Sequence, residues 1–132
     1  MWSKKTKKDD EKWEDINREV ARLTKEKKVN EALNFAQELF DYTKKYYGKK
    51  HKKTIVALNN LGIINILRKD FDEAEAYLLL ALQLSEKMSG KHTEQTSMIN
   101  MNLSKLYSAR AIVINDINEF WDRTSIKDEL KN

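Results

Sequence analysis

Apolar residues recur at three- and four-residue steps through the centre of the chain, between His51 and Gly90. This spacing places side chains on one face of an α-helix. The polar run Arg68-Lys69-Asp70 interrupts the pattern once. The apolar face of the first segment carries Leu58, Leu61, Ile64 and Leu67. We therefore expect two helices joined by a short turn.

A glycine stands inside the first of these expected helices, at Gly62. Glycine in an exposed helix interior costs about 1 kcal/mol relative to alanine, so a packing reason is needed. The simplest reason is a neighbouring helix lying almost against the Gly62 backbone, with the small residues Ala74 and Ala81 facing it. The two helices should then form a tight antiparallel hairpin.

The hairpin pattern repeats along the chain. Matching segments recur 42 residues apart: Asn60-Leu61 with Asn102-Leu103, Thr54 with Thr96, and Gly48-Lys49 with Gly90-Lys91. A unit of this length, in which one helix pair cannot bury its own apolar face, is typical of an α-solenoid. The predicted fold class is therefore all-α.

The central residues resemble a known repeat family. Leu58-Asn59-Asn60-Leu61-Gly62, followed by Phe71-Asp72-Glu73-Ala74-Glu75 and Ala81-Leu82, is similar to a tetratricopeptide repeat. The long period, with a Gly-x-x-His turn from Gly48 to His51, is most similar to the kinesin light chain type. The resemblance covers roughly residues 14–112 and implies a short array of helical hairpins that binds protein.

We expect a polar, lysine-rich lead at residues 1–12 and a single helical domain at 13–132. Its repeats should fall at about 14–48, 51–90 and 93–123. The last unit departs from the pattern because residues 108–122 contain no glycine and no turn dipeptide. Its first helix therefore either runs straight on or bends near residues 109–111 into another helix.

The C-terminal segment carries more apolar surface than a terminal helix needs, including Ile117, Phe120 and Trp121. Repeat arrays normally end in polar caps. Two coverings fit: the segment folds back as a cap on the third repeat, or it packs against another protein, including a second copy of this chain. These three residues are the expected self-association site.

Composition excludes several classes of function. Charged residues make up 35% of the 132 residues and proline is absent, which is typical of a helical surface. The absence of cysteine removes disulfides, thiolate catalysis and cysteine zinc sites, and it suits a reducing compartment, so we expect a cytoplasmic protein. No stretch approaches membrane-spanning length.

Candidate chemistry is sparse. The histidines, His51 and His92, both lie in expected turns between repeats and lack neighbours that would form a nucleophile arrangement. Three glycines cannot build a glycine-rich phosphate loop. We predict no enzyme activity, no catalytic residue, no cofactor and no metal site.

Lysines crowd the turn from Lys44 to Lys53, next to Tyr42, Tyr46 and Tyr47. Aromatic and basic residues together can hold single-stranded nucleic acid, so a basic nucleic-acid-associated helical module is the alternative function. The competing interpretation is a solvated turn beside tyrosines that fill the space between repeats. The net charge of +4 is mild, and nucleic acid is not the expected partner.

The resemblance implies that the first helix of each repeat lines a concave groove. The corresponding positions are Arg18, Arg22 and Lys25, then Asn59, Ile63 and Ile66, then Met101, Lys105 and Ser108. In similar kinesin light chain repeats, an asparagine at the place of Asn59 holds the backbone of an extended peptide. The opposing interpretation buries Ile63 and Ile66 under the chain's own C-terminal helix.

Such a groove would be basic at one end and apolar in the middle. An apolar groove that contains methionine suits the apolar face of a helix. We therefore predict an adaptor or scaffold, such as an assembly factor or chaperone-like subunit. Its partner would be a helical or extended protein segment with apolar anchors and an acidic flank that meets Arg18 and Arg22.

Overall fold

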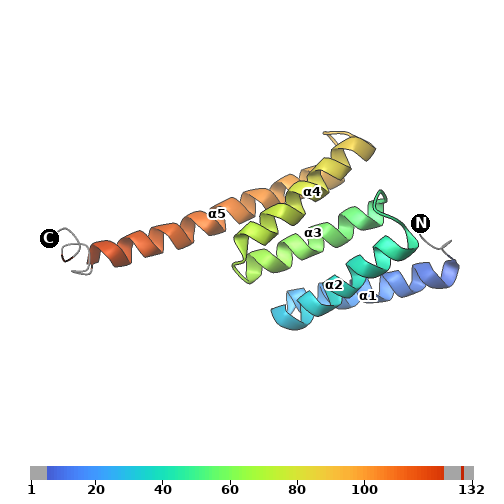
Figure 1. Cartoon of the computed structure of the whole chain (residues 1–132), viewed down its shortest axis with the longest axis horizontal. Helices are drawn as coiled ribbons and strands as arrows, with labels where there is room; N and C mark the ends of the chain where they lie inside the picture. The colour runs from blue at the N-terminus through green and yellow to red at the C-terminus, as the bar shows by residue number, and fades with distance from the viewer. Residues whose placement is uncertain (1–5, 124–128, 130–132) are drawn as a thin grey trace.

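The computed structural model describes residues 6–123 and Glu129. These residues form five α-helices, α1 Lys7–Lys25, α2 Val29–Tyr46, α3 Lys52–Leu67, α4 Phe71–Ser89 and α5 Glu94–Arg123. Each helix packs against the next in antiparallel order (Figure 1). The all-α array of helical hairpins with a long C-terminal helix is confirmed. The expected lead and the end of the expected domain lie partly outside the described residues.

Side-chain hydrogen bonds cap the N-termini of α1 and α3. Thr6 Oγ1 accepts a hydrogen bond from Asp9 N at 3.2 Å, and Asp9 Oδ2 accepts one from Thr6 N at 2.8 Å. This reciprocal capping box starts α1 at Lys7. At α3, His51 Nδ1 accepts a hydrogen bond from Lys53 N at 3.0 Å. His51 is therefore a helix cap.

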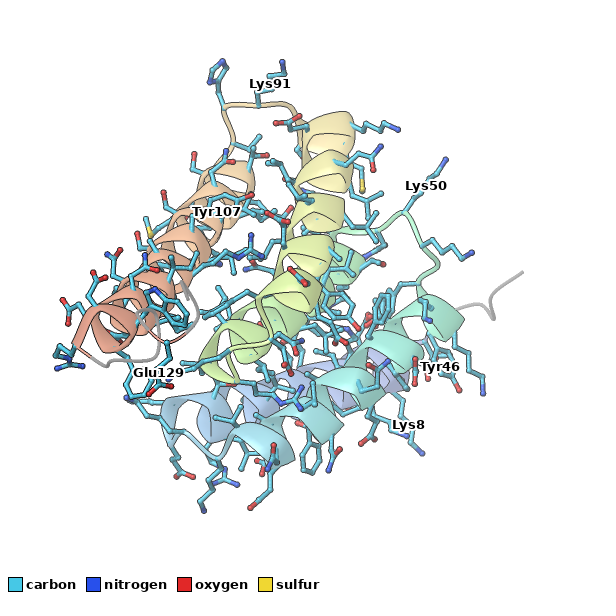
Figure 2. The ribbon with its side chains drawn as sticks, turned by 60° about the vertical axis from the view of Figure 1, so that its left-hand side comes forward. Lys8, Tyr46, Lys50, Lys91, Tyr107 and Glu129 are labelled. Atoms are coloured by element: carbon cyan, nitrogen blue, oxygen red, sulfur yellow. The ribbon has the colours of Figure 1, made fainter. Side chains whose placement is uncertain are left out.

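Equivalent connections recur in successive units. Within the hairpins, Lys27 and Lys69 both occupy the left-handed region, with φ of 59° and 64°. Between the hairpins, two loops carry Lys50 and Lys91, whose side chains Figure 2 shows pointing away from the helices. The matched turns give successive hairpins the same geometry, as a repeat array requires.

The recurring threonines, Thr54 and Thr96, form equivalent hydrogen bonds in the two loops between hairpins. Thr54 Oγ1 donates to the carbonyl oxygen of Gly48 at 2.7 Å, and Thr96 Oγ1 donates to that of Gly90 at 2.9 Å. Both glycines have positive φ, 85° and 94°. Each threonine ties the start of a helix to the glycine that ends the helix before it.

The core is shared between neighbouring hairpins and has two clusters. One joins α1 and α2 to Leu61 and Ile64 of α3, and the other joins Leu58 of α3 to α4 and α5. The central helix α3 contributes to both clusters, so its buried residues lie on more than one side. Burial across successive units explains why one hairpin alone could not provide a core.

The close approach expected at Gly62 is confirmed, but the residue that faces it differs from the expectation. A Cβ atom on Gly62 would lie 2.5 Å from Cγ of Leu78. Ala74 and Ala81 lie one turn away on either side of Leu78 on the same face of α4, and both are fully buried. The leucine between the alanines fills the space that the glycine leaves.

Helix α5 is one continuous helix of 30 residues, so the straight alternative is the one found. Leu106 is its last buried residue, whereas Ile112 and Ile117 are 61% and 60% exposed. We call residues 111–123 the α5 arm, which extends beyond the start of α4 at Phe71 (Figure 1). The alternative in which this segment folds back onto the third repeat is not found for the described residues, because nothing there breaks the helix.

No helix among the described residues combines the length and the apolar character needed to cross a membrane.

Candidate protein-binding surface

The first helices of the repeats, α1, α3 and α5, are linked by pairs of asparagines. Asn60 Nδ2 donates to Asn17 Oδ1 at 2.9 Å, and Asn102 Nδ2 donates to Asn59 Oδ1 at 2.9 Å. Both pairs join residues 43 positions apart. We call these four residues the asparagine ladder. It fixes the register of the three helices whose side chains were expected to line the groove.

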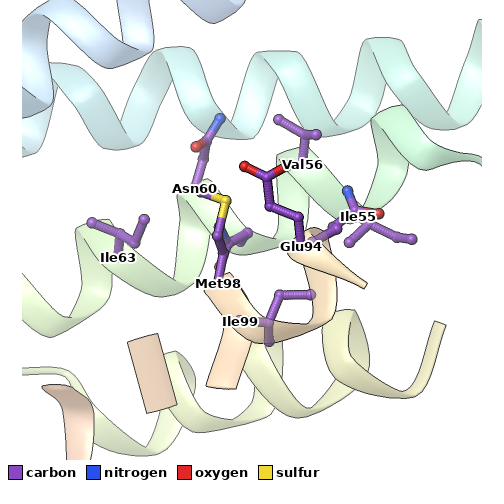
Figure 3. Close-up of a pocket in the computed structure, with 9 residues that line it drawn as sticks. Ile55, Val56, Asn60, Ile63, Glu94, Met98 and Ile99 are labelled. Atoms are coloured by element: carbon purple, nitrogen blue, oxygen red, sulfur yellow. The ribbon is translucent and has the colours of Figure 1, made fainter. Parts of the chain in front are cut away.

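An open pocket of about 370 Å³ lies between α3 and α5, and we call it the α3–α5 pocket. Its lining residues are Ile55, Val56, Asn59, Asn60, Ile63, Glu94, Gln95, Met98 and Ile99. In Figure 3, Asn60 and Ile63 of α3 lie around the same space as Met98 and Glu94 of α5. The pocket therefore combines an apolar lining with amide and carboxylate groups, a set that recognises a ligand by burial and hydrogen bonding.

Asn59 is one of two predicted groove residues that line this pocket. Its Oδ1 already accepts from Asn102, and its Nδ2 has no protein acceptor among the described residues. An amide nitrogen carries two donor hydrogens. Asn59 is half-buried and can therefore donate to a carbonyl oxygen of a bound segment, while its own carbonyl belongs to the ladder.

Ile63 is the second predicted residue in the pocket, and it is half-buried. Ile66, one turn further along α3, packs against the core cluster of α3, α4 and α5. Met101 and Lys105 are exposed on α5 and do not line the pocket. The structure thus brings Asn59 and Ile63 of α3 together in the pocket. It places the predicted α5 residues Met101 and Lys105 on open helix surface.

The arginines expected to form a basic end of the groove already have acidic partners. Arg18 forms an ion pair with Asp15, and Arg22 pairs with Glu26 at 2.8 Å. Arg22 also bonds Glu19, and this hydrogen bond raises the pKa of the Arg22 guanidinium.

All these partners lie on α1 or at its end, and the pairs are largely exposed. Exposed pairs contribute little stability and can exchange partners. An acidic segment would therefore have to replace the carboxylates of α1. Lys25, at the end of the same helix, is exposed.

The sequence analysis missed the residues that the start of α5 contributes. Met98 is 52% exposed and lines the pocket together with Glu94 and Gln95. The positions equivalent to Asn59, Ile63 and Ile66 in the third repeat begin only at Met101, so the start of α5 was left out of the predicted groove. Met98 lies three residues before Met101, and this spacing on one helix face was a usable signal.

Two of the three tyrosines beside the lysine-rich turn, Tyr42 and Tyr47, form hydrogen bonds with α1. Tyr42 Oη donates to the carbonyl oxygen of Asp9 at 3.1 Å and to its Oδ1 at 3.2 Å, and Tyr47 Oη donates to Asp10. Burial, together with the neighbouring Asp9 carboxylate, raises the pKa of Tyr42 to about 12. Hydroxyls held by carboxylates suit packing between helices better than stacking on nucleic-acid bases.

Successive antiparallel helix pairs with a shared core define a helical repeat protein. More narrowly, residues 23–87 match the family model for the tetratricopeptide repeat, so the chain is a tetratricopeptide repeat protein over this segment. The matched residues run from the end of α1 almost to the end of α4. The match identifies the repeat family. It does not distinguish the kinesin light chain type, which stays a prediction.

A curated relative supports the same family. The chain is 29% identical over 85 residues to the Drosophila melanogaster protein named Tetratricopeptide repeat protein 19 homolog, mitochondrial. The alignment covers 64% of this chain and 22% of the relative, so the chain spans about a fifth of the relative's length. No solved structure matches the chain.

Proposed function

We propose that this chain is an adaptor or scaffold that binds a protein segment on the face formed by α1, α3 and α5. Tetratricopeptide repeats imply protein–protein interaction. The observation that carries the proposal is the α3–α5 pocket, which is open, largely apolar and bordered by the asparagine ladder. An assembly factor or a chaperone-like subunit would use such a surface.

The bound segment would place an apolar anchor in the α3–α5 pocket. Met98 and Ile63 would contact the anchor, since methionine adapts its shape to irregular partners. Asn59 Nδ2 would donate to a backbone carbonyl beside the anchor. Lys25 of α1 and Lys105 of α5, both exposed, would meet acidic residues that flank the anchor.

A displayed library of random peptides, selected against the purified chain, tests this proposal without a known partner. Met98→Glu places a carboxylate in the apolar pocket and should weaken binding of the selected peptides by at least about tenfold. The matched control is Met88→Glu on α4, because Met88 is also exposed, at 41%, and lies outside the pocket. Equal binding by both variants would overturn the proposal.

The proposed binding function involves no enzymatic activity, and it does not depend on the cellular compartment. Tetratricopeptide repeat domains are typically non-catalytic, and we propose no enzymatic activity for this chain. The relative's name places that protein in mitochondria, so the cytoplasmic location expected for this chain stays a prediction. Fractionation of cells that produce the tagged protein tests the location directly.

We also propose that the chain self-associates through the α5 arm. Ile117, Phe120 and Trp121 are 60%, 57% and 40% exposed on the arm. Large apolar side chains gathered on one exposed helix commonly mark an interaction site. Light scattering on the purified chain tests this proposal, and a strict monomer at micromolar concentration would contradict it.

A further inference from the structure

A second apolar pocket lies between α2 and α4, the second helices of the first two hairpins. It measures about 440 Å³, and we call it the α2–α4 pocket. Phe40, Leu80 and Leu84 supply much of its apolar lining, and Leu80 is 44% exposed. Thr54 and Leu58 of α3 also line it, but it shares no lining residue with the α3–α5 pocket, so the two pockets are distinct.

Three lysines border the α2–α4 pocket. Lys44 Nζ lies 4.4 Å from the centroid of the Phe40 ring and 3.7 Å from Asp41 Oδ1. Lys49 and Lys50 are exposed in the loop that follows α2, and neither forms an ion pair with a described acidic side chain (Figure 2). Apolar surface bordered by cations fits a ligand that has an apolar anchor beside carboxylates.

The α5 arm of this same chain has that chemistry. Ile117 and Phe120 are three residues apart, so they lie on one face of the helix. Asp116 and Glu119 each precede one of these anchors and are exposed. The arm therefore presents apolar side chains next to carboxylates, the complement of the α2–α4 pocket.

The arm cannot meet the pocket of its own chain. Helix α5 is continuous from Glu94 to Arg123, and Figure 1 shows the arm extending away from the end of the molecule at which α2 joins α3. A second copy must supply the pocket. This step rests on the proposed self-association, and it adds the surface that receives the arm.

We propose that the α5 arm of one copy docks in the α2–α4 pocket of a second copy. Phe120 contacts Leu80 and Leu84, while Asp116 and Glu119 pair with Lys49 and Lys50. The two surfaces differ, so the contact is heterologous: it closes as a reciprocal pair or ring, or it continues as a chain of copies. Pairing of one arm with another arm would instead use the same surface twice.

Charge reversal with mixing tests this contact. An arm variant carries Asp116→Lys and Glu119→Lys, and a pocket variant carries Lys49→Glu and Lys50→Glu. Each variant alone should associate at least about tenfold more weakly than the wild type, because like charges then meet. An equimolar mixture of the two should recover association, since the reversed arm fits the reversed pocket. Light scattering and sedimentation velocity measure the mass.

The controls separate this inference from the proposal on which it rests. Lys87→Glu with Lys91→Glu makes the same charge change at exposed lysines outside the pocket, and it should leave association intact. Circular dichroism checks that each variant keeps its helicity.

Two results would overturn the inference in distinguishable ways. If Phe120→Glu dissociates the assembly but the pocket variant does not, the arm binds another arm, and only the inference fails. If the wild-type chain is a monomer throughout, self-association fails as well. Failure of the mixture to associate would also overturn the inference. None of these variants changes the α3–α5 pocket, so peptide binding is tested independently.

Discussion

Gly62 of α3 lies directly against the side chain of Leu78 of α4. A Cβ atom added to Gly62 would lie 2.5 Å from both Cγ and Cδ2 of Leu78. Leu78 is fully buried, so it has no open space into which to move. The contact explains why a glycine is tolerated inside α3.

We expect Gly62→Ala to destabilise the protein despite alanine's better helix propensity. The propensity gain of about 1 kcal/mol opposes an overpacking cost of about 1–3 kcal/mol, and the very short contact puts the cost at the upper end. Urea denaturation should therefore give a net loss of about 1–2 kcal/mol.

A double-mutant cycle checks the cause of that loss. In a Leu78→Ala background the added methyl group has room, so Gly62→Ala should become neutral or stabilising. An equal loss in both backgrounds would mean that Leu78 is not the obstacle.

The buried pair Trp13 and Thr43 gives a second prediction. Trp13 Nε1 donates to Thr43 Oγ1 at 2.8 Å, and both residues are almost completely buried. Thr43→Val keeps the shape but leaves the indole N–H without an acceptor, which should cost about 1–3 kcal/mol. Thr43→Ser retains the hydroxyl and should cost less. A larger loss for serine than for valine in thermal or urea unfolding would contradict this account.

The Tyr42 hydroxyl predicts how stability changes at alkaline pH. Burial and Asp9 raise its pKa from the ordinary 10.0 to about 12. Because the folded state holds this proton more tightly, the contribution to stability is fully present below pH 10 and is lost as pH rises towards 12. Tyr42→Phe should therefore flatten the alkaline fall in the urea midpoint.

Tyr46→Phe is the matched control for that measurement. The Tyr46 ring lies 4.5 Å from the Tyr42 ring, centroid to centroid, but its hydroxyl donates to no acidic side chain among the described residues. The control should keep the alkaline fall. If both variants titrate like the wild type, the Tyr42 environment is not its source.

The repeat architecture could be predicted from sequence because it depends on periodic features. Leucines at helical spacing, the glycine in α3 and the matched threonines each recur or stand at fixed distances along the chain. The threonines cap equivalent loops through the same bond to a glycine carbonyl. Local periodicity and turn chemistry are carried by short stretches, so one sequence was enough to read them.

The details of the binding surface depended on packing between helices, which periodicity does not specify. The position of Met98 in the pocket follows from where α5 starts and how it lies on α3. The pairing of Asn59 with Asn102 needs their exact register. The acidic partners of Arg18 and Arg22 were visible at three- and four-residue spacing, and the groove assignment overlooked them.

Nuclear magnetic resonance with a library-selected peptide tests the central claim most directly, because it locates the bound segment on the fold. We predict that the side-chain amide of Asn59 and the methyl group of Met98 shift on titration, while the methyl group of Met88 does not. Shifts confined to α2 and α4, with Asn59 and Met98 unchanged, would contradict the claim that α1, α3 and α5 form the binding face.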